Sequence, residues 1–386
     1  MILTAPNFVP TISAAAALAT PGAVIVDLRS PAEFAADHLP GAFNVPLFND
    51  AERAIVGTLY TRDSPDAALA AGRSLVRAHI DGLIGEIARL ARWKLPPVGL
   101  ASLLDAWTSG SIEALDRSLS SAPSESLPER PLVLHCWRGG LRSRSVTSFV
   151  RALGLDRAVA LEGGYKGYRE WVRGSLETWI APPTYVLRGF TGVGKTLVLG
   201  ELERLRRGWT IDLEALAGHR GSVLGMVGLE PCTQKTFESR VFARLAQGFP
   251  AAAVLEGEGR KVGNASLPPR LWAALDAGTN LELTASLDRR VEVLTRDYLE
   301  RPQNRAAIAA ELPFLEQRLG KVKFDGVLSG MFAQGRDREL VLLLLERYYD
   351  PLYRQSEKGR VYAARFDAGD PATAAAEIAH WIEARL

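Results

Sequence analysis

The sequence predicts an α/β protein built from parallel sheets and divided into two domains. At 386 residues the chain is long enough for two domains that each bury a core. A hydrophobic content of 47% with 23% charged residues is typical of globular proteins and argues against broad disorder. Short β-branched runs alternate with helical stretches, which is the pattern of parallel α/β sheets.

The first half of the chain contains three predicted buried strands and one helical insertion. The strands are residues 24–26, 132–134 and 159–161. Between the first two, a helical insert is predicted at about 64–128, where apolar residues recur at helical spacing: Leu69, Val76, Ile80, Leu83, Ile84, Ile87 and Leu90. The Ser-, Pro- and Glu-rich stretch 118–131 predicts a surface loop. The alanine-rich segment 11–20 is too short and lacks the basic start of a signal peptide, so we expect a helix there.

The second half begins a new α/β unit. Its predicted strands are residues 185–187, 209–211, 252–255 and 281–284, and a final helix is expected from Ala372 towards Leu386. Consecutive prolines at Ala181-Pro182-Pro183 favour an extended link, and the helix-prone stretch 168–179 precedes them. We therefore expect a first domain over 1–180 and a second over 181–386.

Composition narrows the partners and the compartment. The net charge of +2 gives no support by itself for a nucleic-acid partner. No apolar run approaches the roughly 18 residues of a membrane span, so no membrane partner is expected. Two cysteines exclude a disulfide framework and suit a reducing compartment, which predicts a cytoplasmic protein. The oligomeric state is not predicted by the sequence.

The segment His135–Ser143, with the letters HCWRGGLRS, follows a predicted strand and opens a helix expected to end near Gly154. A loop at a helix N-terminus directs backbone N–H groups inward and lies at the positive end of the helix dipole. These groups favour the thiolate form of Cys136, which is the candidate catalytic nucleophile. The predicted anion-binding residues of this loop are Arg138, Gly139, Gly140, Arg142 and Ser143. The alternative of a buried structural cysteine fits Cys232 better, because Cys232 has no such neighbourhood.

Two further segments resemble the opening signature of rhodanese domains. They are Asp27–Phe34 and His38–Pro46, and the cysteine loop follows where that family carries its persulfide-forming cysteine. The resemblance covers about residues 10–175, interrupted by the helical insert, and implies a rhodanese-like N-terminal domain. Four polar residues of the signature are expected to brace the fold rather than to do chemistry: Asp27, Arg29, His38 and Asn44.

The cysteine loop is longer than that of thiosulfate sulfurtransferases. It has seven residues from Cys136 to Arg142, whereas those enzymes have six, and it resembles the loop of certain dual-specificity phosphatases. A wider loop has room for a tetrahedral anion such as phosphate or selenophosphate.

The second half contains a complete phosphate-binding motif. Gly189–Thr196 matches G-x-x-x-x-G-K-[ST] between a predicted strand and a helix expected at 197–205, which predicts a P-loop NTPase-like domain. Backbone N–H groups surround phosphate, the lysine supplies a cation and the threonine hydroxyl can ligate Mg²⁺. The predicted phosphate-binding residues are Gly189, Gly192, Gly194, Lys195 and Thr196.

An acidic residue at the end of a neighbouring strand normally orders the metal of such a loop. Two places in the sequence qualify, and the choice between them stays open. Glu256 and Glu258 end one strand in Glu-Gly-Glu, and Asp212 follows another. All three are candidates for metal binding or acid–base chemistry.

Together the two halves resemble the bacterial tRNA 2-selenouridine synthase family. Further segments carry the resemblance along nearly the whole chain: Gly57–Tyr60, Glu162–Lys166, Asp212–Ser222, Gln234–Glu238 and Tyr348–Pro351. The family usually has an acidic Glu-Asp-Glu-like stretch where this chain has Glu256-Gly257-Glu258.

The resemblance implies a transferase that converts wobble 2-thiouridine of tRNA to 2-selenouridine through an S-geranyl intermediate. Its co-substrates are geranyl diphosphate and selenophosphate. Cys136 then carries or positions the selenium donor, with Arg138 and Arg142 holding its phosphate. The Gly189–Thr196 loop holds the diphosphate of the prenyl donor, with ATP and tRNA phosphate as open alternatives. Candidate tRNA-binding residues are Arg204, Arg206, Arg207, His219, Arg220, Arg260 and Lys261.

Three other functions fit parts of the sequence. The first is a phosphatase that uses the seven-residue cysteine loop, which lacks an identifiable carboxylate acid. The second is a P-loop ATPase whose rhodanese half senses redox state. The third is a plain rhodanese-type sulfurtransferase, which thiosulfate-to-cyanide turnover would distinguish.

Overall fold

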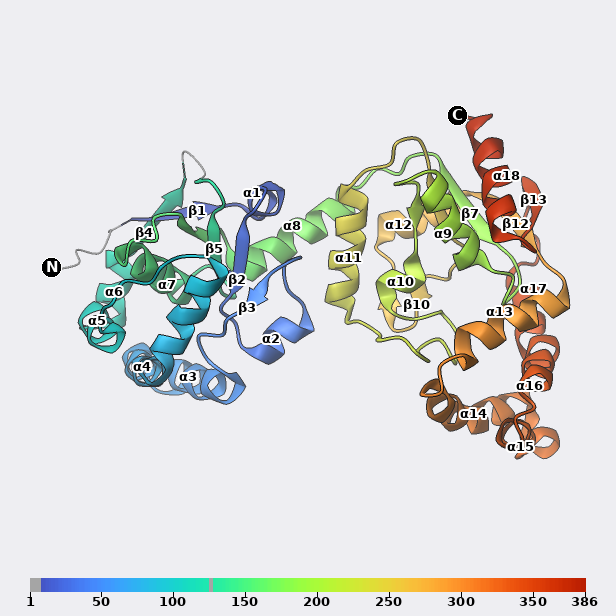
Figure 1. Ribbon diagram of the computed structural model, residues 1–386, viewed down its shortest axis with the longest axis horizontal. Coiled ribbons are helices and arrows are strands. Elements are labelled where there is room, and N and C mark those ends of the chain that lie inside the picture. Colours follow the sequence, from blue (N-terminus) through green and yellow to red (C-terminus); the bar gives the residue numbers. More distant parts are fainter. Residues whose placement is uncertain (1–7, 125–127) are drawn as a thin grey trace. The chain divides into compact units, whose positions relative to one another are not determined.

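The computed structural model describes residues 8–124 and 128–386 (Figure 1). The chain divides into two compact units, Met1–Gly174 and Ser175–Leu386. The division falls inside helix α8 (Gly164–Thr178), a few residues before the predicted proline link. Residues 1–7 of the predicted first domain and residues 125–127 of the predicted insert and loop lie outside the described residues.

Unit 1 is an α/β unit around one six-stranded sheet. Its strands are β1 (Phe8–Ile12), β2 (Val24–Asp27), β3 (Phe43–Asn44), β4 (Ser120–Pro123), β5 (Leu132–His135) and β6 (Ala158–Leu161). Its helices are α1 (Ala14–Ala19), α2 (Pro31–Ala36), α3 (Asp50–Arg62), α4 (Pro65–Leu90), α5 (Leu100–Trp107), α6 (Ile112–Ser118) and α7 (Leu141–Ala152), followed by α8. The strand order is β3-β2-β5-β6-β1-β4, and every neighbouring pair is parallel.

The predicted strands of this half are confirmed as β2, β5 and β6. The prediction that 118–131 is only a surface loop is wrong, because β4 lies within it. The helical insert begins at Asp50, earlier than residue 64, and comprises α3 to α6. Strand β4 consists of two serines, an alanine and a proline, which are residues with little preference for strands, so its sequence did not predict it. Pairing with β1 holds it at the edge of the sheet.

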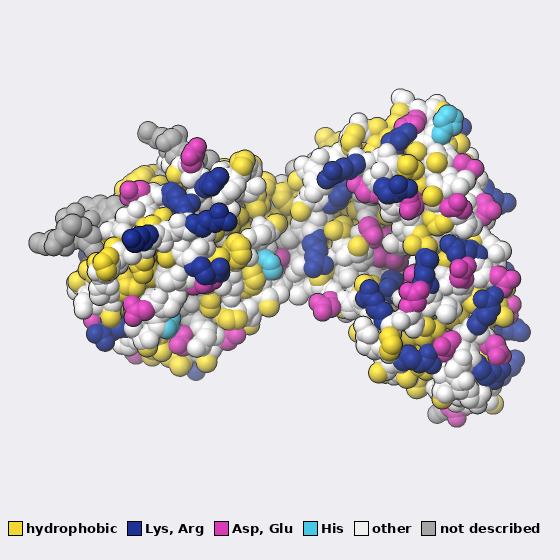
Figure 2. Space-filling view, viewed as in Figure 1, with side chains coloured by type: hydrophobic (Ala, Val, Ile, Leu, Met, Phe, Trp, Pro, Cys, Tyr) yellow, Lys and Arg dark blue, Asp and Glu magenta, His cyan; other side chains and the backbone are white. Residues whose placement is uncertain are grey.

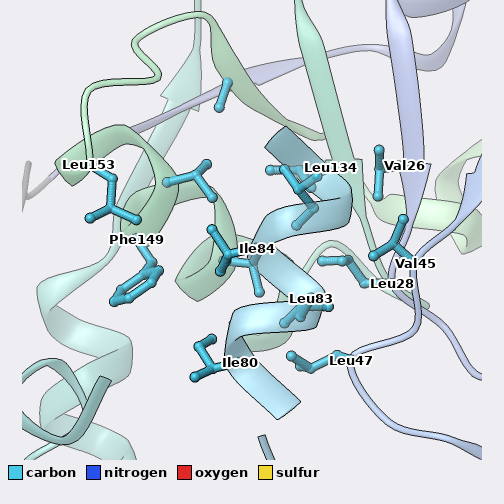
Figure 3. Close-up of a cluster of buried hydrophobic side chains, with 14 of the residues drawn as sticks. Val26, Leu28, Val45, Leu47, Ile80, Leu83, Ile84, Leu134, Phe149 and Leu153 are labelled. Carbon is cyan, nitrogen blue, oxygen red and sulfur yellow. The ribbon is translucent and has the colours of Figure 1, made fainter. Parts of the chain in front are cut away.

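The core of unit 1 joins the insert to the sheet. Ile80, Leu83 and Ile84 of α4 lie in one buried cluster with residues of β2, β5 and α7 (Figure 3). Position 27 pairs with position 135 in the register of β2 and β5, so the carboxyl ends of these strands lie side by side. This register brings the loop after β2 next to the cysteine loop after β5.

Unit 2 is a second parallel α/β unit. Its strands are β7 (Thr184–Arg188), β8 (Thr210–Ile211), β9 (Ala253–Glu256), β10 (Lys261–Val262), β11 (Ala265–Ser266), β12 (Thr279–Thr284) and β13 (Ala364–Asp367). The main sheet has the order β13-β12-β7-β9-β8 and is parallel throughout, whereas β10 and β11 form a separate antiparallel pair. All four predicted strands of this half are confirmed, as β7, β8, β9 and β12.

The helices of unit 2 cover its sheet and extend beyond it. They are α9 (Lys195–Leu205), α10 (Leu213–Ala217), α11 (Gln234–Ala246), α12 (Pro269–Ala277), α13 (Leu287–Leu299), α14 (Asn304–Phe324), α15 (Val327–Ala333), α16 (Asp337–Leu344), the π-helix η1 (Leu345–Tyr349), α17 (Asp350–Ser356) and α18 (Pro371–Glu383). Helix α18 packs against α9 over the sheet. Within the described ranges, none of the helices combines the length and the apolar character needed to cross a membrane.

Candidate functional site

The cysteine loop lies between β5 and α7, as the sequence predicts. The Cys136 side chain is buried, and its Sγ lies 3.3 Å from the hydroxyl oxygen of Ser143. Ser143 in turn donates a hydrogen bond of 3.3 Å to the carbonyl oxygen of Gly140. Arg138 is exposed and Arg142 is half-buried, and neither has a hydrogen-bond or ion-pair partner in residues 8–124 or 128–386. Guanidinium groups without a counter-charge are the groups that proteins use to bind anions, so the geometry is compatible with the predicted anion site.

The shape of this loop depends on one glycine rather than two. Gly139 has a φ of 64°, and a Cβ there would lie 2.8 Å from the carbonyl oxygen of Leu161 and 2.9 Å from the backbone nitrogen of Gly164. Gly140, by contrast, has a φ of −84° and open space where a Cβ would be. The expectation that both glycines allow the backbone to curl is therefore correct only for Gly139.

The Glu162–Lys166 segment supports the loop from behind. The N–H of Tyr165 donates to the carbonyl oxygen of Cys136 (2.9 Å), and the N–H of Lys166 donates to that of Trp137 (2.8 Å). Gly164 has a φ of 57°, and a Cβ there would lie 2.5 Å from the Cys136 carbonyl oxygen. Backbone contact at this distance holds the cysteine at a fixed position relative to β6 and α8.

A buried polar network braces the neighbouring strand ends. Arg29 is 1% exposed and forms an ion pair of 2.6 Å with Asp27. It also donates to the carbonyl oxygen of Asp37 (2.7 Å) and lies over the ring of Tyr165 at 3.7 Å. The Tyr165 hydroxyl donates to the Asp37 carboxylate (2.8 Å). The side-chain amide of Asn44 donates to the carbonyl oxygens of residues 27 and 29. The network satisfies its buried charges internally, so a bracing role is confirmed.

Neither histidine of this region is placed as a base. His38 stacks on Phe34 at 3.9 Å between ring centroids, and its Nδ1 lies 3.0 Å from the Phe34 carbonyl oxygen. His135 is fully buried, and burial lowers its pKa to about 4. A neutral, enclosed imidazole next to Cys136 is a structural element of the strand end.

The phosphate-binding loop connects β7 to α9. Gly189, Gly192 and Gly194 all have positive φ values, of 152°, 78° and 92°. The ammonium group of Lys195 donates to the carbonyl oxygen of Gly189 (3.2 Å), which closes the loop. The N-terminus of α9 begins at Lys195, so the free N–H groups of this helix point at the same space.

Residues distant in sequence support this loop. Arg290 donates to the carbonyl oxygen of Thr191 (2.9 Å) and forms a bidentate pair with Asp350, at 2.5 and 3.0 Å. Tyr353 accepts a hydrogen bond from the N–H of Gly189 and its ring lies 4.9 Å from that of Phe190. Asp350 belongs to the Tyr348–Pro351 segment, so this segment supports the phosphate-binding loop through Arg290.

Three carboxylates gather beside the loop: Glu214, Glu256 and Glu258 each place an oxygen within 4.8 Å of the others. The hydroxyl of Thr196 donates to Glu256 (3.0 Å) and lies 3.3 Å from a Glu214 oxygen. Glu256 is fully buried, and its Oε1 has no hydrogen-bond partner among the described residues.

The environment of these carboxylates disfavours their charged forms. Burial, together with the charge of Glu258, raises the pKa of Glu214 to about 7. Burial and the charge of Glu214 raise the pKa of Glu256 well above its ordinary value, and burial raises that of Glu258. A cation would relieve both the repulsion and the desolvation, and clustered carboxylate and hydroxyl oxygens are the donors that Mg²⁺ prefers.

One predicted member of this group has another role. Asp212 caps helix α10, accepting a hydrogen bond of 2.7 Å from the N–H of Ala215. Asp212 also lies beside Glu256, whose pKa it helps to raise, and Glu214, which was not predicted, joins Glu256 and Glu258 in the carboxylate cluster. An N-cap side chain is held by backbone N–H groups, whereas a residue in the first helical turn is free to face the loop.

A cavity of about 750 Å³ opens over the phosphate-binding loop. Its lining includes Lys195, Thr196, Glu214 and Glu258, which brings the predicted phosphate and acidic residues together. Aromatic side chains complete the wall: Trp272, Tyr298, Tyr348, Tyr349 and Tyr353. The cavity therefore has the phosphate-binding motif and carboxylates at one side and flat, partly apolar surface at the other.

The candidate tRNA-binding residues fall into separate places. Arg220 lines this cavity, and His219 accepts a hydrogen bond from the N–H of Gly221 within the same segment. Arg260 and Lys261 are exposed just after the acidic strand end. Three others lie at the end of α9 away from its N-terminal phosphate loop: Arg204, Arg206 and Arg207. Two of these are paired with acids, Arg204 with Glu201 and Arg206 with Glu383.

Basic and acidic side chains are mixed on the visible face of the molecule, as the near-neutral net charge implies (Figure 2).

The supporting residues Arg290, Asp350 and Tyr353 were missed as site residues by sequence reasoning. The sequence pointed to one part of this support, the Tyr348–Pro351 segment, because that segment carries part of the family resemblance described in the sequence analysis. Their role depends on contacts across more than fifty residues of chain.

Comparison with known proteins gives matches in both halves of the chain. Residues 182–385 match the family model of the tRNA 2-selenouridine synthase AAA domain, and residues 12–71 match that of the rhodanese-like domain. Curated proteins named tRNA 2-selenouridine synthase are similar along most of the chain. The protein from Photobacterium profundum is 32% identical, covering 85% of this chain and 87% of its own. Those from Chromohalobacter salexigens and Cupriavidus necator are 29% and 31% identical, each covering 88% of this chain and 90% of its own.

Proposed function

The chain belongs to the tRNA 2-selenouridine synthase family, and on that basis we propose that it is a transferase acting on tRNA. In this proposal it alkylates the sulfur of wobble 2-thiouridine with geranyl diphosphate and then replaces the S-geranyl group with selenium from selenophosphate. One observation carries the proposal. The chain has two different loops suited to anions: one has a buried cysteine and two arginines with no partner among the described residues, and the other has a complete phosphate-binding motif beside carboxylates.

The alkylation step suits the phosphate-binding loop. The thiocarbonyl sulfur attacks the first carbon of the geranyl group, the C–O bond breaks, and diphosphate leaves with the electron pair. The N3 proton of the nucleoside is released to water, so the product is the neutral S-geranyl nucleoside. Lys195 and the N–H groups of α9 neutralise the charge that grows on the departing diphosphate. The apolar and aromatic walls of the adjoining cavity suit a prenyl chain.

A magnesium ion fits the carboxylates beside this loop. Thr196, Glu214, Glu256 and Glu258 would hold it, and the unpartnered Oε1 of Glu256 supplies a ligand atom that no hydrogen bond occupies among the described residues. When bound, Mg²⁺ would add positive charge next to the diphosphate. ATP and a tRNA phosphate are the competing occupants of the loop, and the geranylation assay with Lys195→Ala distinguishes geranyl diphosphate from these two.

The selenium step suits the cysteine loop. Arg138 and Arg142 hold the phosphate of selenophosphate, and Cys136 lies at the centre of the loop beside Ser143. Selenide forms a bond to C2 of the nucleoside, and the C2–S bond breaks. Its electron pair leaves with the geranyl thiolate, which takes a proton, while water receives the phosphoryl group. Selenium stays at the oxidation level of selenide, so no oxidant or reductant is required.

The two loops make separable predictions. Lys195→Ala should slow formation of S-geranylated tRNA by about a hundredfold or more, because a donor to the developing charge is lost. Cys136→Ser should leave that step unchanged and abolish conversion to selenouridine. The measurement is mass spectrometry of thiolated, geranylated and selenylated nucleosides after incubation of thiolated tRNA with each donor.

Cys232→Ser is the matched control, because Cys232 lies in the other unit, where its thiol lies 3.4 Å from the Leu216 carbonyl oxygen. It should keep both activities. Normal geranylation by Lys195→Ala would refute the assignment of this loop to geranyl diphosphate and leave ATP or tRNA phosphate as its ligand. Full selenylation by Cys136→Ser would refute the role of the cysteine.

A further inference from the structure

The helical insert of unit 1 and the cysteine loop line an open cavity, and the reaction described above uses only the cysteine-loop end of it. Its volume is about 920 Å³, and its walls come from residues 47–48, α3 to α6, the cysteine loop and α7. Five of its apolar lining side chains are labelled in Figure 3: Leu47, Ile80, Leu83, Ile84 and Phe149. Protein interiors normally close apolar voids of this size, because an unfilled one forfeits dispersion contacts. The size and lining indicate a ligand-binding space for an apolar group.

The cysteine loop forms one end of this cavity. Cys136, Arg138 and Arg142 all belong to its lining. The three other guanidinium groups of the lining are engaged elsewhere: Arg144 by Asp116 and the carbonyl oxygen of Leu119, Arg73 by the carbonyl oxygen of Thr108, and Arg53 by Glu33. The space therefore joins a site for an anion to an interior of aliphatic and aromatic side chains. Such walls cannot replace water around a charge, so the deeper part suits only an uncharged, apolar group.

We propose that this cavity binds the geranyl chain of the S-geranylated nucleoside while the cysteine loop delivers selenium to C2. The inference rests on the proposed function. Selenium must approach the same carbon that carries the S-geranyl group, so the prenyl chain has to lie immediately beside the bound selenium donor. The donor's phosphate is held by Arg138 and Arg142, and the apolar space that adjoins them receives the ten-carbon chain.

The cavity gives the alkyl group a binding role in addition to its chemical one. A free 2-thiouridine offers the loop little apolar surface, whereas the geranylated nucleoside buries a chain of methyl and methylene groups. The C2–S bond then breaks with the chain in place, and geranyl thiol is the product that leaves the cavity. The helical insert thus selects the geranylated nucleoside, and the cysteine loop positions the selenium donor.

The first experiment fills the cavity. Ala68 lines it and is 4% exposed, so Ala68→Leu places three more carbon atoms in the space. The variant should lower kcat/KM for selenylation of S-geranylated tRNA about tenfold, the loss expected when two methylene groups find no buried position. Selenylation of S-methylated tRNA, prepared by chemical methylation of thiolated tRNA, should stay within about twofold of the wild type. Ala70→Leu, on the exposed face of the same helix, is the control and should change neither rate.

The second experiment enlarges the cavity. Val76→Ala should raise the rate with S-farnesylated tRNA relative to S-geranylated tRNA, which a variant that merely misfolds cannot do. Equal effects of Ala68→Leu on the geranyl and methyl substrates, with no shift in Val76→Ala, would overturn the cavity assignment and leave the proposed function intact. If the wild-type protein selenylates none of these alkylated tRNAs, the proposed function itself is wrong, and this inference falls with it.

Discussion

The conformation of the cysteine loop predicts very different effects for alanine at two adjacent glycines. Gly139→Ala puts a side chain at a φ of 64°, which costs roughly 1–2 kcal/mol for a residue other than glycine. Its Cβ would also lie 2.8 Å from the carbonyl oxygen of Leu161 and 2.9 Å from the nitrogen of Gly164, and both atoms are backbone. Forcing apart a packed region in this way costs about 1–3 kcal/mol. The sum is a loss of about 2–5 kcal/mol in the free energy of unfolding.

Gly140→Ala is the matched control, because its φ is −84° and nothing lies within 4 Å of an added Cβ. It should change stability by no more than about 0.5 kcal/mol. Urea unfolding of the full chain measures both losses, and peptide-resolved alkylation with iodoacetamide reports the accessibility of Cys136. We expect faster alkylation of Cys136 only in Gly139→Ala, since the loop must move away from β6. Equal destabilisation by the two variants would refute this account of the loop.

Three further predictions follow from buried charges. Burial lowers the pKa of His135 from 6.5 to about 4. Between these two pH values the imidazole binds a proton in the unfolded chain but not in the folded chain. The free energy of unfolding is therefore unaffected by this histidine above pH 6.5, and it should fall by ~3 kcal/mol as the pH drops to 4. In urea unfolding measured at a series of pH values, His135→Gln should remove this loss. Asp350→Asn leaves Arg290 buried without its counter-charge, which should cost about 3 kcal/mol or more in urea unfolding and weaken binding of inorganic pyrophosphate in calorimetry. Glu256→Gln removes a carboxylate that faces Thr196 and should weaken Mg²⁺ binding in the presence of pyrophosphate by about tenfold or more, measured by titration calorimetry.

Each of these predictions has its own control and contrary result. A stability profile whose slope is the same with and without His135 would show that this imidazole does not titrate as described. Asp337→Asn tests the Asp350 prediction, because the Arg305–Asp337 pair is partly exposed and its loss should cost less than about 1 kcal/mol. An equal loss in the free energy of unfolding for the two variants would contradict the claim that the Arg290–Asp350 pair is a buried support of the phosphate loop. For the metal, Glu201→Gln on the surface of α9 should leave Mg²⁺ binding unchanged.

The parts of the molecule that could be predicted from the sequence are local in the chain. The strands before Cys136 and Gly189 are short, mostly apolar runs, and the loops that follow them owe their form to neighbouring glycines and to the helix that each opens. A pattern of residues within about ten positions is sufficient for such features. The division into two α/β units follows for the same reason.

The parts that escaped prediction depend on contacts between distant segments. That Glu214 lies within 4.8 Å of Glu256 and Glu258 depends on how α10 packs beside the strand end of β9. The support of the phosphate loop by Arg290 and Tyr353 depends on how α13 and α17 pack, which no short window of sequence specifies. The strands β4 and β13 are short edge strands of ordinary composition, and pairing with a neighbour holds them in place.

The π-helical turn η1 sets the direction in which α17 presents its side chains. A π-turn holds one residue more than an α-helical turn, and each residue of a helix advances the direction of its side chain by about 100°. Removing one residue from Leu345–Tyr349 would therefore restore a regular helix and rotate Asp350 and Tyr353 away from the phosphate loop. The number of residues in this turn is consequently as strictly constrained as the glycines of the loop itself. A chain with a one-residue deletion here would keep every residue of the phosphate-binding motif and still lose the support that holds it.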